Sequence, residues 1–264
     1  MKKYFVIGNP IDHSLSPKLH NYWLNDNKIK ASYHKKKLDI SEIKDFILNI
    51  KKNDIFGVNI TVPFKKEIIP YLNELSPEAK ATQSVNTISL DGEKMIGHNT
   101  DVGGFELGIK NKNFQVKNKK IFILGAGGVV PSIIYALNKM GAKDIFVSNR
   151  TKSRAENLTS LFKNITIVDW GDIPNFDMII NATSLGLNED DELDLDFSKI
   201  GKDKIFYDVI YNPKTTNFLN KGVKLGNIAE NGKMMFIYQA LIAFKIWHNI
   251  EPKINDEVIK LLYQ

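Results

Sequence analysis

The sequence predicts an α/β protein of two domains, one of which is of Rossmann type with a parallel, doubly wound sheet. Three observations predict this class. Strand-like and helix-like segments alternate, a glycine-rich turn at 125–128 joins a buried strand to a helix, and another strand follows that helix after Gly141. The 264 residues suffice for two ordinary domains. The chain has no cysteine, which excludes disulfides and thiolate ligands, and we expect no metal site.

Short elements are expected in the first hundred residues. Strands are predicted at 4–7, 31–38 and 57–62, with Pro63 ending the third. Hydroxyl or carboxylate caps are expected to begin three helices, at Ser16, Ser76 and Asp101. A further helix is predicted over 41–50, where Ile43, Phe46, Ile47 and Ile50 share one face. Asp91 and Gly92 predict a hairpin between 85–90 and 94–97.

The remaining chain follows a strand–helix–strand rhythm. Strands are predicted at 121–124, 144–148, 166–168, 178–181 and 205–209, and helices at 129–140, 234–248 and 255–263. We expect one α/β domain over 1–100 that takes in the last helices, 240–264, and a second domain, of Rossmann type, over 101–239.

The charge pattern excludes several classes of partner. The net charge is +6, and the lysines are spread along the chain without a run interleaved with aromatic residues, so we expect no nucleic-acid partner. The apolar run at 4–7 is too short for a signal peptide. No stretch approaches the ~18–20 apolar residues that span a bilayer. These features predict a cytoplasmic protein without a membrane partner.

The glycine turn indicates a dinucleotide site. Gly125, Gly127 and Gly128 stand between a predicted strand and a predicted helix, where backbone N–H groups can approach a pyrophosphate. The third glycine of the strict fingerprint is missing, because Val130 stands there. An ordinary strand-to-helix turn is the alternative.

The arginines indicate which dinucleotide binds. All basic residues are lysines except Arg150 and Arg154, and both follow the strand that ends at Ser148. An NAD site usually has an acidic residue there, and this turn has none. The planar guanidinium makes two-pronged contacts with phosphate, which predicts NADP. The alternative is a pair of surface arginines on a helix.

Polar residues gather in four stretches of the first hundred residues. The stretches place hydroxyls, amides, a lysine and an aspartate near element ends, over 14–17, 59–65, 85–87 and 99–101. Singly, each has an ordinary structural explanation, because serine and aspartate cap helices and Lys65 is one lysine among many.

Together with the glycine turn, these stretches resemble the shikimate dehydrogenase family over nearly the full chain. The matching stretches are Gly8–Pro10, Ser14–Pro17, Asn59–Lys65, Val85–Thr87, Asn99–Asp101, Gly125–Gly128, Asn149–Thr151, Asn181–Gly186, Tyr211–Pro213 and Gln239. The resemblance implies the reversible, NADPH-dependent reduction of 3-dehydroshikimate to shikimate, on the route to chorismate and the aromatic amino acids.

The resemblance also implies a role for each matching position. Lys65 and Asp101 correspond to the family's catalytic pair. Substrate ligands are implied at Ser14, Ser16, Asn59, Thr61, Asn86, Tyr211 and Gln239. Contacts with NADP(H) are implied at Gly125, Ala126, Gly127, Gly128, Val129, Asn149, Arg150, Thr151, Arg154, Thr183, Ser184, Val209, Gly232 and Met235.

The residue types suit this chemistry. Hydride addition to a carbonyl leaves an alkoxide, which a lysine ammonium can stabilise and protonate. The sequence leaves open whether Lys65 transfers the proton or acts mainly as a binding cation. Three positions depart from the family pattern: Ser84, Pro131 and Met234. Pro131 removes a backbone donor and a position that is often basic, so Arg150 and Arg154 must anchor more of the cofactor.

Two other functions remain open. One is a quinate/shikimate dehydrogenase of mixed cofactor use, which the absence of an acid beside Arg150 disfavours. The other is a non-catalytic sensor of dinucleotide or shikimate, which the presence of both Lys65 and Asp101 disfavours. We expect a monomer or a homodimer.

Overall fold

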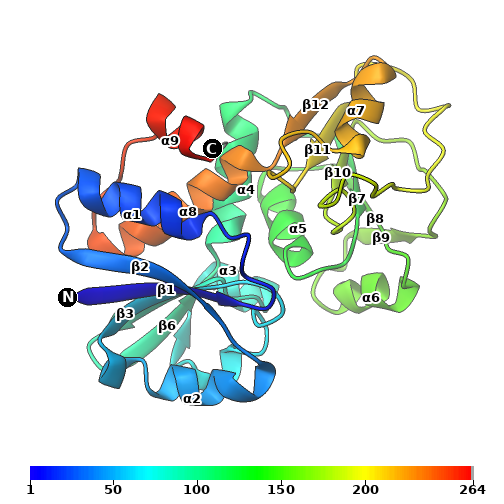
Figure 1. Ribbon diagram of the computed structural model, residues 1–264. Coiled ribbons are helices and arrows are strands. Elements are labelled where there is room, and N and C mark those ends of the chain that lie inside the picture. Colours follow the sequence, from blue (N-terminus) through cyan, green and yellow to red (C-terminus); the bar gives the residue numbers. More distant parts are fainter. Residues whose placement is uncertain (263–264) are drawn as a thin grey trace. The chain divides into compact units, whose positions relative to one another are not determined.

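The fold is taken from a computed structural model of the chain, which describes residues 1–262 (Figure 1). The chain forms two compact units, Met1–Gly104 with Ile237–Gln264 (the first unit) and Phe105–Phe236 (the second unit). It passes between them inside two helices, α4 (Thr100–Asn111) and α8 (Lys233–His248). Each unit contains a six-stranded sheet, and the predicted α/β class is confirmed.

The first unit is built on a mixed sheet of order β2-β1-β3-β5-β6-β4. Its strands are β1 (Lys2–Gly8), β2 (Ala31–Lys37), β3 (Ile55–Ile60), β4 (Glu74–Leu75), β5 (Thr87–Asp91) and β6 (Lys94–His98). Successive side chains of β1 face opposite sides of the sheet. Tyr4 packs on Trp247 of α8, and Phe5 packs on Phe46 of the helix α2 (Ile43–Leu48). Both faces of this sheet are therefore covered.

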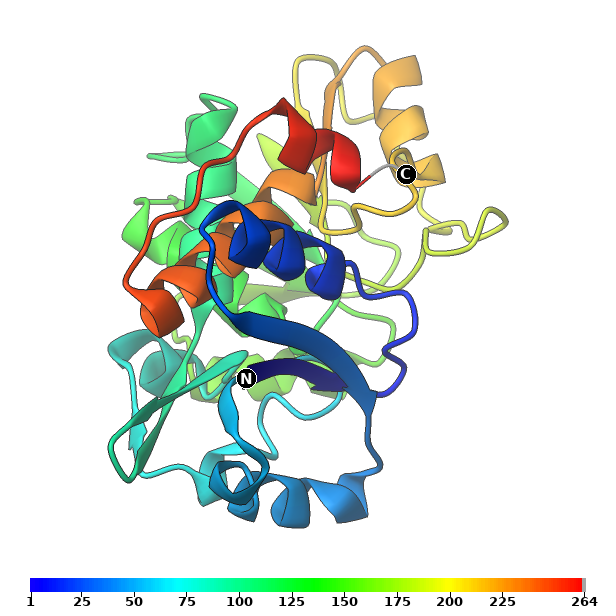
Figure 2. The same ribbon diagram turned by 60° about the vertical axis from the view of Figure 1, so that its left-hand side comes forward.

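The remaining helices of the first unit are short. They are α1 (Ser16–Asp26), α3 (Pro77–Thr82) and α9 (Asp256–Leu261), with 3-10 turns at Ile40–Glu42, Lys51–Asn53 and Ile69–Tyr71. The segment from Lys253 into α9 lies along α1 (Figure 2). Tyr22 of α1 donates to Glu257, and the Trp23 indole donates to the carbonyl of Lys253. The predicted last helix ran to Tyr263, which lies outside the described residues.

Several local expectations hold and others need correction. Ser76 caps α3 and accepts from the backbone N–H of Ala79, as predicted. The hairpin at Asp91-Gly92 is confirmed by the antiparallel pair β5 and β6. The four apolar residues expected on one face of 41–50 are all buried, although only 43–48 is α-helical.

The predicted caps at Ser16 and Asp101 are wrong. Ser16 is the first residue of α1, and the capping position is Leu15, without a side-chain bond. Asp101 lies inside the first turn of α4, where its backbone N–H donates to the side chain of Asn99. The third strand ends at Ile60 rather than at residue 62, so Thr61 lies beyond it. Pro63 has no N–H for the ladder, so pairing stops before it.

The second unit contains an all-parallel sheet of order β12-β11-β10-β7-β8-β9 (Figure 1). Its strands are β7 (Lys120–Leu124), β8 (Asp144–Ser148), β9 (Ile165–Val168), β10 (Met178–Asn181), β11 (Ile205–Asp208) and β12 (Ile228–Asn231). The chain runs outward from β7 to β9, then returns to β10 on the other side of β7. This reversal leaves a switch point between β7 and β10, where open α/β sheets bind ligands.

Helices α5 (Val130–Lys139), α6 (Lys152–Glu156) and α7 (Asn217–Lys224) accompany this sheet, with a 3-10 turn at Asn157–Ser160. The crossovers after β7 and β11 run in opposite directions, so right-handed connections put α5 and α7 on opposite faces. Between β10 and β11 an extended segment carries buried Leu193, Leu195 and Phe197 into the same apolar cluster as Phe218 of α7. No helix within residues 1–262 combines the length and apolar character needed to cross a membrane.

A histidine is buried in the first unit without a partner for one ring nitrogen. His20 stacks on Tyr33 with ring centroids 4.3 Å apart, and its Nε2 has no hydrogen-bond partner. Burial, with a smaller effect of nearby His248, lowers the pKa of His20 to about 3. Folded protein therefore keeps His20 neutral at pH values where an unfolded chain protonates it.

We predict that His20 makes the protein less stable in mild acid. Below an unfolded pKa near 6.5, only the unfolded state binds this proton, so the free energy of unfolding falls as the pH drops toward the folded pKa. Between pH 6.5 and 5 the loss is about 2 kcal/mol. His20→Phe keeps a ring and removes this titration. Urea unfolding at both pH values should show a smaller loss in the variant, and equal losses would contradict the assignment.

Candidate functional site

A lysine and an aspartate meet in the first unit. Lys65 lies just beyond β3, and Asp101 lies in the first turn of α4. Lys65 Nζ is 2.6 Å from Asp101 Oδ2, and their side chains are only 13% and 9% exposed. The backbone carbonyl of Lys65 also accepts from the N–H of Val85, which ties the lysine to the segment leading into β5. The pair predicted to be catalytic is thus in direct contact.

An asparagine amide holds the other oxygen of the Asp101 carboxylate. Asn86 Nδ2 donates to Asp101 Oδ1 at 2.9 Å. Asn86 is itself fixed, because its Oδ1 accepts from the backbone N–H of Thr100 at 2.7 Å and from the hydroxyl of Thr87 at 3.2 Å. The carboxylate therefore accepts from an ammonium on one oxygen and an amide on the other.

A tyrosine that the sequence did not indicate joins this group. Tyr33 on β2 donates to Asn59 Oδ1 at 2.6 Å, and Asn59 Nδ2 donates to the hydroxyl of Thr87 at 2.9 Å and to the carbonyl of Asn86 at 3.2 Å. Burial raises the pKa of Tyr33 well above its usual value, while a hydrogen bond with Ser16 acts in the opposite direction. Tyr33 is thus neutral, and its single hydroxyl proton is donated to Asn59.

The other predicted substrate ligands fall in both units. Ser14 is half-buried, and its hydroxyl accepts from the backbone N–H of Ser16 at 3.4 Å. Thr61 lies next to β3, and its N–H donates to the carbonyl of Ile7. Gln239, on α8, belongs to the first unit, whereas Tyr211 belongs to the second.

The glycine turn lies at the switch point of the second unit. Gly125 has φ +112°, and a Cβ there would stand 2.7 Å from the carbonyl oxygen of Ala182. Only glycine therefore lets the ends of β7 and β10 approach this closely. Helix α5 begins at Val130 without a side-chain cap at Val129, and Pro131 occupies its first turn, as expected. No side chain at the capping position therefore accepts from the first N–H groups of α5.

The two arginines lie on the surface just beyond β8. Asn149 shapes the turn by donating to the carbonyl of Thr151 at 2.8 Å. Arg150 and Arg154 are exposed, and within the described part of the chain neither forms an ion pair with a carboxylate. The nearby acid Asp169 instead pairs with Lys152 at 2.7 Å. Among the described residues, both guanidinium groups are therefore exposed and without a carboxylate partner.

A buried carboxylate organises the strand ends beside the turn. Asp208 accepts from Asn181 Nδ2 at 3.2 Å on both oxygens, from the hydroxyl of Thr216 at 2.7 Å and from the N–H of Ile210 at 3.0 Å. Burial raises the pKa of Asp208 to about 6, against the effect of these donors. Asp208 and Thr216 were not predicted from the sequence, although the polar run from Asp208 to Pro213 at the end of a predicted strand was an available signal.

The same cluster shapes two predicted cofactor segments. Asn181 Oδ1 accepts from the N–H and the hydroxyl of Thr183, at 3.1 and 2.7 Å, while Ser184 is exposed. Beyond Asp208, the carbonyl of Val209 lies so close to Gly232 that a Cβ there would collide with it. These segments thus lie at the carboxyl ends of neighbouring strands β10, β11 and β12.

One tyrosine and one methionine complete the set of site residues predicted in the second unit. Tyr211 stacks on Phe236 with ring centroids 4.4 Å apart. Met235 is buried at the start of α8, next to Met234, which stands where the family usually has glycine. Gly128, Ala126 and Gly127 lie in the turn before α5.

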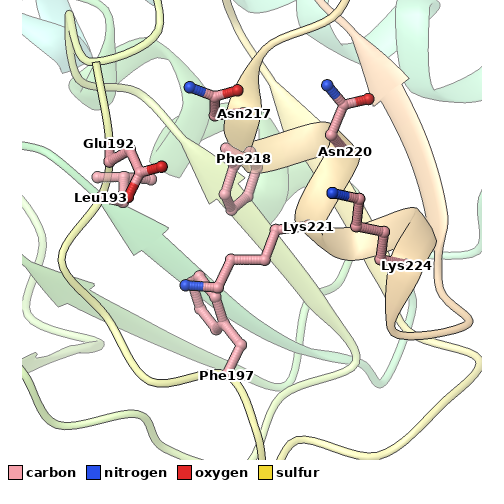
Figure 3. Close-up of a pocket in the computed structure, with 8 residues that line it drawn as sticks. All are labelled: Glu192, Leu193, Phe197, Asn217, Phe218, Asn220, Lys221 and Lys224. Atoms are coloured by element: carbon pink, nitrogen blue, oxygen red, sulfur yellow. The ribbon is translucent and has the colours of Figure 1, made fainter. Parts of the chain in front are cut away.

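A hollow beside α7 lies outside these segments. Figure 3 shows it lined by Glu192, Leu193, Phe197, Asn217, Phe218, Asn220, Lys221 and Lys224. Lys221 already donates to the carbonyl of Leu195 and lies over the ring of Phe197. None of the predicted site residues lines it. In residues 1–262 no group of three histidines or acids is placed to hold a metal ion.

Known families match both units. The shikimate dehydrogenase substrate-binding domain matches residues 6–88, and the shikimate/quinate 5-dehydrogenase family matches residues 108–188. An NADP(+) shikimate dehydrogenase of Pelagibacter ubique is 59% identical over 263 residues, which are 99% of both chains. The chain belongs to the shikimate dehydrogenase family. A further member, from Caldicellulosiruptor saccharolyticus, is 40% identical and covers 99% of this chain and 98% of its own.

Solved structures of the family share the fold. A shikimate dehydrogenase of Aquifex aeolicus is 35% identical with a TM-score of 0.92, over 100% of this chain and 98% of its own. A Thermus thermophilus member in complex with NADP(H) and shikimate is 27% identical, with a TM-score of 0.91 over 100% and 99% of the two chains. The predicted architecture of a substrate domain followed by a Rossmann domain is that of the family.

Proposed function

We propose that this chain catalyses the reversible, NADPH-dependent reduction of 3-dehydroshikimate to shikimate, a step toward chorismate and the aromatic amino acids. The observation that carries the proposal is the 2.6 Å contact of Lys65 Nζ with Asp101 Oδ2, in the unit that matches the family's substrate-binding domain. A protein that only binds its ligand has no need of this buried proton donor. We propose that the first unit binds substrate and the second binds NADP(H).

The reaction needs a proton at one oxygen atom. NADPH supplies the hydride when it is bound. Hydride addition turns the ketone oxygen of the substrate into an alkoxide, and the Lys65 ammonium stabilises this charge and gives it a proton. Asp101 orients the ammonium through its Oδ2. In the reverse direction neutral Lys65 accepts the hydroxyl proton of shikimate.

The substrate's carboxylate and hydroxyls call for neutral hydrogen-bonding groups. We propose that the hydroxyls of Ser14 and Ser16 bind the carboxylate, since they lie at the start of α1, where N–H groups favour an anion. Thr61, Asn86, Tyr211 and Gln239 are proposed as partners of the ring hydroxyls. Asn59 is proposed to belong to this set as well, and its amide N–H groups also donate to the Thr87 hydroxyl and the Asn86 carbonyl.

The second unit offers the donor set that NADP requires. The turn at Gly125 brings backbone N–H groups and the uncapped start of α5 to the switch point, which suits the pyrophosphate. Arg150 and Arg154 are proposed to bind the 2′-phosphate, while the segments at Thr183, Ser184, Val209, Gly232 and Met235 contact the remainder. We further propose that the enzyme works in the cytoplasm as a monomer or a homodimer.

A steady-state assay of the purified protein tests this function. Shikimate and quinate are each combined with NADP and NAD, and formation of the reduced cofactor is followed by absorbance. We expect the highest kcat/KM for shikimate with NADP. Equal use of quinate and NAD would favour the mixed quinate/shikimate enzyme instead, and binding without turnover would favour a sensor.

We predict that Lys65→Ala lowers kcat by roughly 10²–10⁴-fold, the usual effect of losing a general acid/base. The neighbouring exposed lysine provides the matched control, and Lys66→Ala should leave kcat within about twofold. Both variants are compared with the wild type in the shikimate–NADP assay. An unchanged rate in Lys65→Ala would exclude the assigned role.

We predict that Arg150→Ala weakens NADP much more than NAD. Loss of a two-pronged contact between guanidinium and phosphate raises the KM for NADP by roughly 10-fold or more, from a charge-assisted bond of about 1.5–3 kcal/mol. Lys163→Ala removes an exposed charge elsewhere in the second unit and serves as control. Equal losses for both cofactors would show that Arg150 does not read the phosphate.

A further inference from the structure

The buried hydrogen bonds of the first unit run as one directed chain toward the catalytic pair. Tyr33 donates to Asn59 Oδ1, and Asn59 Nδ2 donates to Thr87 Oγ1. The Thr87 hydroxyl donates to Asn86 Oδ1, and Asn86 Nδ2 donates to Asp101 Oδ1. We call these five residues the relay. Each member donates a hydrogen bond to the next, and the last donor, Asn86, bonds the Asp101 carboxylate.

The direction of the relay follows from the chemistry of its ends. A carboxylate can only accept, so Asn86 must present its NH₂ group to Asp101 and its carbonyl oxygen to Thr87. At the other end the Tyr33 hydroxyl presents its proton to Asn59, which turns the Asn59 NH₂ group toward Thr87. Two groups select this orientation of the Asn59 amide over its flipped form: the Tyr33 hydroxyl, which donates to Oδ1, and the backbone carbonyl of Asn86, which can only accept and bonds Nδ2.

Burial makes the orientation matter. Tyr33 and Thr87 are 2% and 0% exposed, and Asn59 and Asn86 are also buried, so water does not compete for these groups. Hydrogen bonds in a medium of low polarity strengthen one another along a chain, and an unpaired member is costly. A flipped amide at Asn59 would place two acceptors or two donors against each other. The changed hydrogen bonds along the relay would then alter the orientation of the Asp101 carboxylate.

We propose that Tyr33 and Thr87 are positioning residues, which act through Asn59 and Asn86 to hold the Asp101 carboxylate in the orientation that Lys65 needs. This inference rests on the proposed function, in which Lys65 transfers the proton. Neither residue is exposed enough to meet substrate. Other contacts fix Tyr33 in place, because its backbone N–H and carbonyl both bond the side chain of Asn21 and its ring stacks on His20.

Four variants test the proposal in the shikimate–NADP assay. Tyr33→Phe and Thr87→Val each remove one hydroxyl with little change of shape, and we expect kcat to fall by about 10-fold, roughly the effect of losing one hydrogen bond, with the KM for shikimate within about threefold. Thr87→Ser keeps the hydroxyl and should stay within about twofold of wild type. Tyr4→Phe removes a hydroxyl from a buried tyrosine outside the relay and should leave kcat unchanged.

The two threonine variants separate polarity from packing. If Thr87 served only to fill space, Ser would be slower than Val, the reverse of the order that the relay requires. The Tyr33→Phe/Thr87→Val double variant should be no slower than about twice the worse single variant, because both substitutions break the same chain. A multiplied loss, an unchanged kcat in Tyr33→Phe, or a loss confined to KM would overturn the proposal.

A second measurement does not depend on catalysis. In ¹⁵N-labelled protein the side-chain NH₂ signals of Asn86, assigned by their disappearance in Asn86→Asp, should move in Tyr33→Phe and stay in place in Tyr4→Phe. If the wild type did not convert shikimate, the proposed function would be wrong, but a shift of the Asn86 signals in Tyr33→Phe would still demonstrate the relay. Unmoved Asn86 signals in Tyr33→Phe would show that the relay does not transmit orientation.

Discussion

The contact of Lys65 with Asp101 is the interaction on which the first unit is arranged. Two largely buried charges lose hydration, and their attraction offsets this loss only when the remaining polar groups are also satisfied. The structure meets this condition with the donor from Asn86, which the first residues of β5 and of α4 hold in place. The geometry of the proposed catalytic pair therefore depends on where β3 ends and where β5 and α4 begin.

The buried carboxylate of the second unit, Asp208, has a different set of hydrogen-bond donors. Asp208 accepts from an amide, a hydroxyl and a backbone N–H, and no cation is among these donors. Burial consequently outweighs the donors and raises its pKa to about 6. Asp101 thus has a charged partner, Lys65, which we propose for proton transfer, whereas Asp208 bonds the loops that follow strands β10 and β11.

Much of the fold could be predicted because its signals are local. The helix begun by Ser76 and Pro77, the hairpin at Asp91-Gly92 and the strand–turn–helix around Gly125 each depend on residues a few positions apart. Helix α7 was missed, although Thr216 caps it, because Gly222 and asparagines weaken its helical pattern. The cap of α4 was misplaced because Asn99, two positions earlier, accepts from the backbone N–H of Asp101, and the cap of α1 was misplaced by one position because Leu15 stands there without a side-chain bond.

The sequence by itself determined which chemical groups the protein carries: a lysine and an aspartate at element ends, a glycine turn after a buried strand, and two arginines where a 2′-phosphate would lie. These rest on residue type and short spacing. Only the tertiary structure decided how the groups are connected. Tyr33 and Asn59 lie 26 positions apart, and they meet because β2 and β3 flank β1 on the same sheet. Such a contact depends on strand order and register, which local pattern does not encode.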